Sequence, residues 1–227
     1  MPFNLQTFKT RTVTAIVFGA VMLVGLLWNW WSFLFLFTII HFGCWYEFIR
    51  LMGKITPQKY LSYIPLGLFY ITLPIWCLSD LWAYVIIDGS LPLQRFGLIP
   101  VIIIVSIWIN DTMAYIVGSL IGKTPFSKIS PKKTWEGTLG GGLLCVIIIG
   151  IVGWNINYYS AKDWIIISAL CAVFGTLGDL LQSKLKRLAR VKDSGSLLPG
   201  HGGFLDRFDS LLIATVFVWL YVHFFMR

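Results

Sequence analysis

Charged residues are scarce in this sequence, and their scarcity decides the class of protein. Only 12% of the 227 residues are charged, whereas 57% are hydrophobic and the mean hydropathy is +0.79. A soluble domain of this length could not bury so much apolar surface and still keep a charged exterior. The composition therefore excludes an ordinary soluble enzyme and predicts an all-α, polytopic bundle of transmembrane helices.

Cysteine is scarce as well, and acids are outnumbered by bases. The four cysteines lie far apart within apolar runs, at Cys44, Cys77, Cys145 and Cys171. Neither zinc-site spacing nor a disulfide framework is visible, so we interpret them as small buried hydrophobic residues. The net charge is +8, but the bases alternate with long apolar stretches. This pattern favours membrane lipids with an anionic surface, and not nucleic acid, as the partner.

Long apolar runs predict about seven membrane helices, each close to the ~20 residues that cross a bilayer. They cover residues 12–28, 30–51, 60–78, 97–118, 138–154, 164–182 and 208–226. The piece 81–87 is too short to cross, and counting such short or broken helices would give eight or nine. No small-residue cleavage site follows the first run, so we expect an uncleaved helix and not a signal peptide.

The basic residues predict the orientation. With the N-terminus inside, all but three of the 18 lysines and arginines lie on the cytoplasmic side, the exceptions being Arg95, Lys162 and Arg227. The positive-inside rule favours this topology. It places the polar loops 118–137 and 183–207 in the cytoplasm. We divide the chain into N-terminal transmembrane helices, 1–106, and a C-terminal catalytic membrane region, 107–227.

The ten acidic residues give the first indication of function. All except Asp80, Asp88 and Asp163 are expected at the cytoplasmic face. Asp111 and Asp179 lie inside apolar runs, where an ionisable group is costly and is by default a functional candidate. A salt bridge between helices is the alternative. Acids and bases gathered on one face predict a site for a metal ion and a polyanion.

The first polar loop contains Gly122-Lys123-Thr124, but the spacing from Gly118 is one residue too short for a P-loop, and no strand precedes it. Hydroxyls and lysines just before a predicted helix suit a phosphate, because unpaired amides and the helix dipole face the same way. They are Ser127, Ser130, Lys132, Lys133 and Thr134. An ordinary positive-inside loop is the alternative. We interpret the glycines at 137 and 140–142 as helix-packing positions.

The second loop is denser in cationic donors for phosphate oxygens: Lys184, Lys186, Arg187, Arg190 and Lys192. Asp206 and Asp209 are three residues apart at the start of the last predicted span, so they share one helix face. With Asp179 or Asp193 they form an oxygen-ligand set suited to Mg²⁺. Helix capping is the alternative for both acids, and a structural turn for His201.

The spacing of these residues resembles the signature of the phosphatidate cytidylyltransferase (CDP-diacylglycerol synthase) family. That signature reads S-x-x-K-R, four residues, K-D-x-G, then P-x-H-G-G-x-x-D-R-x-D. It is matched by Ser183, Lys186, Arg187, Lys192, Asp193, Gly195, Pro199, His201, Gly202, Gly203, Asp206, Arg207 and Asp209. The first loop is similar to the family through Asp111, Ser130, Lys133, Thr134 and Glu136, and Arg11 and Glu47 match single positions. The similarity is strong over about residues 107–227.

The resemblance implies an Mg²⁺-dependent transfer of CMP from CTP to phosphatidic acid in phospholipid biosynthesis, by an integral membrane protein that forms homodimers in at least some members. We expect catalytic roles for Asp206, Asp209, Lys186, Arg187 and His201. Substrate binding is expected of Ser130, Lys132, Lys133, Thr134, Ser183, Lys192 and Arg207. The expected metal ligands are Asp179, Asp206, Asp209 and Asp193, with Asp111 as an outer ligand or a ligand of a second, monovalent cation.

His201 would either contact the nucleotide or protonate pyrophosphate. A bacterial plasma membrane is expected, because the long N-terminal extension of eukaryotic relatives is missing. The rival enzymes are a polyprenol kinase and an archaeal-lipid cytidylyltransferase. A transporter or channel would use Asp111 and Asp179 as an ion path, but the acids crowd one face instead of crossing the bilayer, and no inverted repeat is evident. A purely structural role is the least favoured alternative, because a scaffold would not need two loops so dense in phosphate-binding residues.

Overall fold

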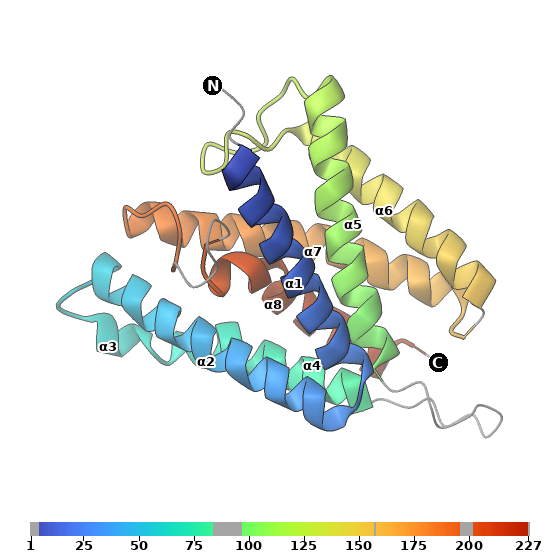
Figure 1. Cartoon of the computed structure of the whole chain (residues 1–227), viewed down its shortest axis with the longest axis horizontal. Coiled ribbons are helices and arrows are strands. Elements are labelled where there is room, and N and C mark those ends of the chain that lie inside the picture. Colours follow the sequence, from blue (N-terminus) through green and yellow to red (C-terminus); the bar gives the residue numbers. More distant parts are fainter. Residues whose placement is uncertain (1–4, 84–96, 157, 196–201, 227) are drawn as a thin grey trace. The chain divides into compact units, whose positions relative to one another are not determined.

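The computed structural model describes residues 5–83, 97–156, 158–195 and 202–226, with side chains from residue 16 onward. The helices are α1 (Leu5–Leu27), α2 (Trp30–Ile55), α3 (Tyr60–Tyr63), α4 (Leu73–Ala83), α5 (Leu98–Ile121), α6 (Trp135–Ile156), α7 (Ala161–Leu188) and α8 (Leu205–Phe224), and a π-helical turn covers Leu68–Thr72 (Figure 1). Over these residues the extended structure is limited to one isolated bridge, between Pro125 and Thr134. The all-α class is confirmed.

Five helical segments in the described part of the chain are long and apolar enough to cross a membrane: Trp30–Ile55, Tyr60–Ala83, Leu98–Ile121, Trp135–Ile156 and Ala161–Leu188. Each overlaps one of the predicted spans. The first predicted span lies almost entirely within α1, whose part Ile16–Leu27 is apolar. α8, the helix of the last predicted span, is not among the five. The chain is a multi-pass helical membrane protein.

The chain folds into two compact units. The first consists of Met1–Thr72 and Leu185–Phe208, and the second of Leu73–Lys184 and Asp209–Arg227. The helices α7 and α8 therefore each contribute residues to both units. The predicted division at residue 106 concerns where the chemistry is concentrated, and it stays a prediction.

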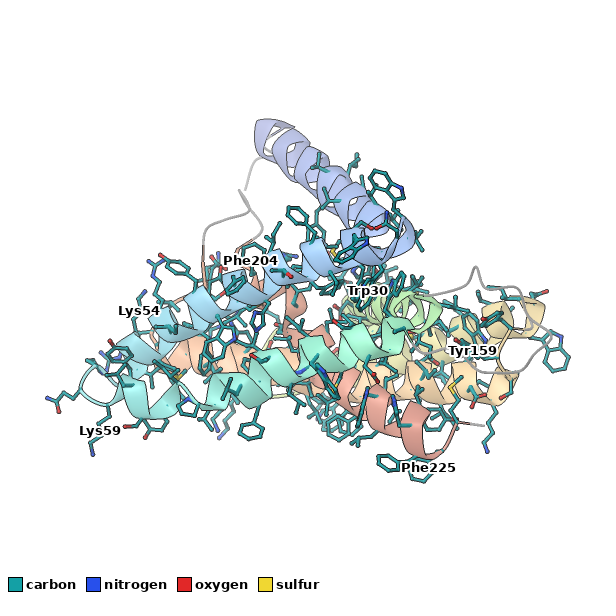
Figure 2. The ribbon with its side chains drawn as sticks, turned by 90° about the horizontal axis from the view of Figure 1, so that it is seen from below. Trp30, Lys54, Lys59, Tyr159, Phe204 and Phe225 are labelled. Atoms are coloured by element: carbon teal, nitrogen blue, oxygen red, sulfur yellow. The ribbon has the colours of Figure 1, made fainter. Side chains whose placement is uncertain are left out.

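In the first unit, α1 and α2 are joined by a turn that the sequence specifies locally. Asn29 accepts a hydrogen bond from the Ser32 amide, and the Ser32 hydroxyl accepts one from the Asn29 amide, which forms a capping box at the start of α2. α2 then runs from Trp30 to the basic end at Lys54, beyond which lies Lys59 (Figure 2). Its aromatic residues on the outer face, such as Trp31, are exposed, which suits contact with lipid.

Prolines shape the third predicted span. Pro74 has no amide hydrogen, and its ring conflicts with the carbonyl four residues earlier. The π-helical turn Leu68–Thr72 ends two residues before it, and prolines and π-bulges are both sites where helices become irregular. α3 ends at Tyr63, two residues before Pro65. The span is therefore continuous enough to cross a membrane and yet irregular in its first half.

In the second unit, small residues allow close helix packing. A Cβ added at Gly137 would lie 2.7 Å from the Ala114 carbonyl oxygen, and one at Gly141 would lie 2.5 Å from the Ala114 nitrogen. This confirms for both glycines that they serve the packing of α5 against α6. α7 meets α8 where Gly178 contacts the backbone of Asp209. All four cysteines are buried and form no disulfide, as the sequence predicts.

Candidate functional site

A buried carboxylate on α2 organises the polar part of the first unit. The Glu47 side chain, only 3% exposed, accepts hydrogen bonds from the Ser194 hydroxyl at 2.6 Å, the Phe204 amide at 2.9 Å and the Leu205 amide at 3.0 Å. Two of these donors are amides at the start of α8, where helix amides have no partner within the helix. In Figure 2, Phe204 lies beside α2. Glu47 therefore caps α8 and fastens the preceding loop.

Asp206 is held at the same place by three donors. Its Oδ1 accepts from the Lys186 ammonium at 2.7 Å, and its Oδ2 accepts from the amides of Ser194 at 2.8 Å and Gly203 at 3.0 Å. Burial alone would raise the pKa of Asp206, but these hydrogen bonds outweigh burial and lower the pKa below its ordinary value. Asp206 is therefore an anion, and it forms an ion pair with Lys186 at the end of α7.

Two glycines of the signature make room for the Glu47 carboxylate. A Cβ added at Gly195 or at Gly203 would overlap the oxygens of Glu47. Any other residue at either position would push the loop away from α2 and break the hydrogen bonds just described. The signature glycines thus serve the contact with Glu47 as well as any ligand.

In the second unit the first polar loop folds back on itself. The Phe126 amide donates to the Lys133 carbonyl, and the Trp135 amide donates to the Thr124 carbonyl. The Thr134 hydroxyl caps α6 by accepting from the Gly137 amide at 3.1 Å. The Glu136 carboxylate accepts from the amides of Lys123 and Thr124 and from the Thr124 hydroxyl. The loop is closed by its own residues.

Acids of the second unit gather around one lysine. The Lys133 ammonium lies 2.5 Å from Asp179 Oδ2, and Asp111 lies close enough to both for electrostatic interaction. Because Gly178 contacts the Asp209 backbone, Asp179 and Asp209 are carried by the same helix crossing. Asp209 is itself buried, and its Oδ1 lies 2.6 Å from the Ser210 amide.

The structure brings some of the predicted site residues together and leaves others apart. Lys186 pairs with Asp206, and Lys133 pairs with Asp179. Among the other predicted site residues, Ser130, Thr134 and Ser183 are half-buried, and the exposed ones are Asp111, Lys132, Arg187, Lys192, Asp193 and Arg207. His201 lies outside the described residues. Over the described residues, no three His, Cys, Asp or Glu side chains are close enough to share a metal ion.

Two residues of this arrangement were missed as site residues by the sequence reasoning. Glu47 was noted as a family position but given no role, and Ser194 fills an unspecified place in the signature. Glu47 lies within the predicted span 30–51, so the rule that singled out Asp111 and Asp179 applies to it equally. The signal that could have found Glu47 was therefore present. Its partners were not visible, because they lie 147 to 158 residues away.

Comparison with known proteins shows which family this chain resembles. A model of the cytidylyltransferase family matches residues 86–225, which include both polar loops. Phosphatidate cytidylyltransferase of Staphylococcus haemolyticus is 47% identical over 109 residues, covering 47% of this chain and 42% of that protein. Phosphatidate cytidylyltransferase of Synechocystis sp. is 42% identical over 130 residues, covering 55% and 43%.

A plant protein, phosphatidate cytidylyltransferase 4, chloroplastic, of Arabidopsis thaliana, is 41% identical over 117 residues, which are 50% of this chain and 29% of that protein. The chain spans less than half the length of these three relatives.

Proposed function

Because the chain belongs to the cytidylyltransferase family, we propose that it transfers CMP from CTP to phosphatidic acid, giving CDP-diacylglycerol and pyrophosphate. The observation that carries this proposal is the ion-paired cluster of Lys186 and Asp206 at the start of α8, inside the region that matches the family. A lysine held in place by a buried acid, with further basic residues nearby in the sequence, is suited to phosphate groups. The relatives named above carry the name of this reaction.

The reaction needs little covalent help from the protein. A phosphate oxygen of the lipid attacks the α-phosphorus of CTP, and the bond from that phosphorus to the bridging oxygen of the β-phosphate breaks. The nucleophile is already anionic near neutral pH, since the second pKa of a phosphate monoester is about 6. No strong general base is required. The difficulty is to bring two polyanions together and to stabilise the charge on the departing pyrophosphate.

The basic residues of the second loop answer that difficulty. Lys186, Arg187, Lys192 and Arg207 would hold the triphosphate and the leaving pyrophosphate, with Ser183 as a further donor. Arg207 and Lys192 are exposed and so are accessible to a ligand. Ser130, Lys132, Lys133 and Thr134 would bind phosphate from the first loop, although the Thr134 hydroxyl already caps α6. His201 would contact the nucleotide or protonate pyrophosphate.

The acids have the donor chemistry that Mg²⁺ prefers, because each offers carboxylate oxygens. The bound ion would supply charge neutralisation at the α-phosphate and at pyrophosphate. Asp179, Asp206 and Asp209 are the proposed ligands, and Asp193 is a further candidate. Asp206 would have to exchange the Lys186 ammonium for the ion. Asp111 would be an outer ligand or would bind a second, monovalent cation.

The setting of the site follows from the substrates. CTP is a cytosolic metabolite and phosphatidic acid can present its headgroup between helices. We therefore propose that both polar loops and the N-terminus face the cytoplasm of a bacterial plasma membrane. The resemblance to the family supports a further proposal, that the protein acts as a homodimer. The excess of lysine and arginine on that predicted side supports the orientation.

The test is a transfer assay with the purified protein in detergent. Labelled CTP and phosphatidic acid are incubated with and without Mg²⁺, and lipid-soluble label and pyrophosphate are measured. We expect Mg²⁺-dependent label in the lipid with stoichiometric pyrophosphate. Release of CDP would indicate a lipid kinase instead, and label appearing only with polyprenols or ether-linked lipids would indicate another acceptor. No transfer to any acceptor by folded protein would contradict the proposal.

A further inference from the structure

Glu47 and Asp206 both accept hydrogen bonds from Ser194 and from residues at the start of α8. Glu47 accepts from the Ser194 hydroxyl and from the amides of Phe204 and Leu205. Asp206 accepts from the Ser194 amide and from the Gly203 amide. Ser194 is therefore shared, with its side chain bound to one carboxylate and its backbone bound to the other. Ser194 thus links Glu47 directly to Asp206.

From Asp206 the chain of contacts leads to a cation. Asp206 holds the Lys186 ammonium at 2.7 Å, and the Lys186 side chain is 17% exposed. A partly exposed ammonium fixed by a buried anion is positioned in advance of its ligand, which is how charged groups stabilise developing negative charge efficiently. The placement of Lys186 therefore depends on contacts that end at α2.

We propose that Glu47 is a positioning residue for the transfer reaction: it fixes the residues on either side of 195–202 and, through Ser194 and Asp206, aims Lys186 at the phosphates of the nucleotide. This inference rests on the proposed function. Glu47 touches no substrate, and its effect is on the geometry of the groups that do. The rival interpretation is a purely structural role, in which Glu47 stabilises the first unit and nothing more.

The hydrogen-bond pattern requires a carboxylate at this position. Oε1 faces the Phe204 amide, and Oε2 faces the Leu205 amide and the Ser194 hydroxyl. In Glu47→Gln, the amide nitrogen would face a backbone N–H group in either orientation, so at least one cap bond is lost. The side chain keeps its length and nearly its volume. Glu47→Gln therefore perturbs the positioning network with little change in packing.

A matched control is available in the second unit. Asp163 is also buried, at 5% exposed, and accepts hydrogen bonds from the Ser160 hydroxyl and the Tyr221 hydroxyl, each at 2.6 Å. It lies at the start of α7, at the opposite end of that helix from Lys186. Asp163→Asn removes a buried, hydrogen-bonded carboxylate without touching the signature.

The experiment compares wild-type protein, Glu47→Gln and Asp163→Asn in detergent by thermal unfolding, by hydrogen–deuterium exchange and by transfer kinetics. In Glu47→Gln we expect faster exchange in peptides covering residues 191–207 and a loss of about 100-fold in kcat, the size of effect that small misplacements of catalytic groups produce. The KM for phosphatidic acid should stay near that of the wild type. Asp163→Asn should lower the unfolding temperature while leaving kcat and the exchange of residues 191–207 unchanged.

Two results would overturn the inference while the wild-type enzyme is active: unchanged exchange of residues 191–207 in Glu47→Gln, or a kcat equal to that of the wild type. A wild-type protein that transfers nothing would instead remove the proposed function, and exchange alone would then decide whether Glu47 holds the loop. If Glu47→Gln fails to fold, Ser194→Ala removes only one of the three donors. It should show the same changes at smaller size, and wild-type behaviour in that variant would count against the inference.

Discussion

In the first unit, both oxygens of Glu47 and both oxygens of Asp206 accept hydrogen bonds from the protein. In the second unit, Asp179 is paired with Lys133, and Asp111 lies close enough to both for electrostatic interaction. The first arrangement uses carboxylates to hold Ser194 close to the residues that begin α8. The second places two acids beside one lysine, near the crossing of α7 and α8. The acids of the first unit hold backbone and side-chain donors in place, whereas those two of the second unit lie beside a lysine.

The two loops differ in the same way. The first is fastened by Glu136, which binds residues 12 and 13 positions earlier in the chain. The second is fastened by Glu47, whose partners are 147 to 158 positions later. The hydrogen bonds of Glu136 form whenever that segment folds, because their partners are close in the sequence. Those of Glu47 form only when the second loop meets a separate helix, α2. The second loop should therefore be the more sensitive to substitution.

The largest effect is expected from Asp209→Asn. The substitution removes a charge from the group of acids suited to Mg²⁺, so transfer should fall by about 1,000-fold or more. The folded protein should remain in the membrane, and exchange of residues 191–207 should match the wild type. Transfer kinetics over a range of Mg²⁺ concentrations measure the first expectation. Near-normal activity would remove Asp209 from the metal ligands and would blur the distinction between the two units.

A loss of about 100-fold in kcat/KM for CTP is expected from Lys186→Met, because one fixed cation facing the developing charge is lost. Asp206 keeps its two amide donors, so the loop should hold its conformation by hydrogen–deuterium exchange. Lys162→Met, an exposed lysine on the predicted outer side, is the control and should behave as the wild type. Equal effects of the two substitutions would argue against a role for Lys186 at the phosphates.

The smallest effect is expected from Glu136→Gln. Glu136 is half-buried and its carboxylate binds only groups that are near in the sequence, so transfer should fall by less than about fivefold. The measurement is kcat beside that of Glu47→Gln under the same conditions. A loss as large as that of Glu47→Gln would show that the local hydrogen bonds of Glu136 and the distant ones of Glu47 matter equally, which contradicts the comparison drawn above.

Hydropathy predicted the membrane helices well because it needs only the composition of a window. It placed the end of the sixth predicted span at residue 182, whereas α7 continues to Leu188. The extra turns are polar and amphipathic, so they are helical without being apolar. The π-helical turn before Pro74 was not predicted either, since proline's conflict with the preceding turn can be relieved in several ways.

The signature predicted which residues carry the chemistry, and the Lys186–Asp206 pair lies within it. It could not predict that Thr134 caps α6, that Glu136 binds Lys123 and Thr124, or that Ser194 contacts Glu47. Spacing along the chain reports on neighbours in one helix or loop. It does not report which distant helix supplies a buried partner, because that depends on how the helices pack.

The distance along the chain between Glu47 and Ser194 has a consequence for the order of synthesis. α2 is made and inserted 147 residues before the hydroxyl that Glu47 binds. An unpartnered acid in an apolar helix is costly, so the early membrane intermediate carries this cost until residues 194–205 arrive. The signature loop is thus both a part of the candidate active site and the final fastening of the N-terminal helices. In a nascent chain that ends before residue 194, Glu47 of α2 would lack the hydrogen-bond donors that it has in the folded protein.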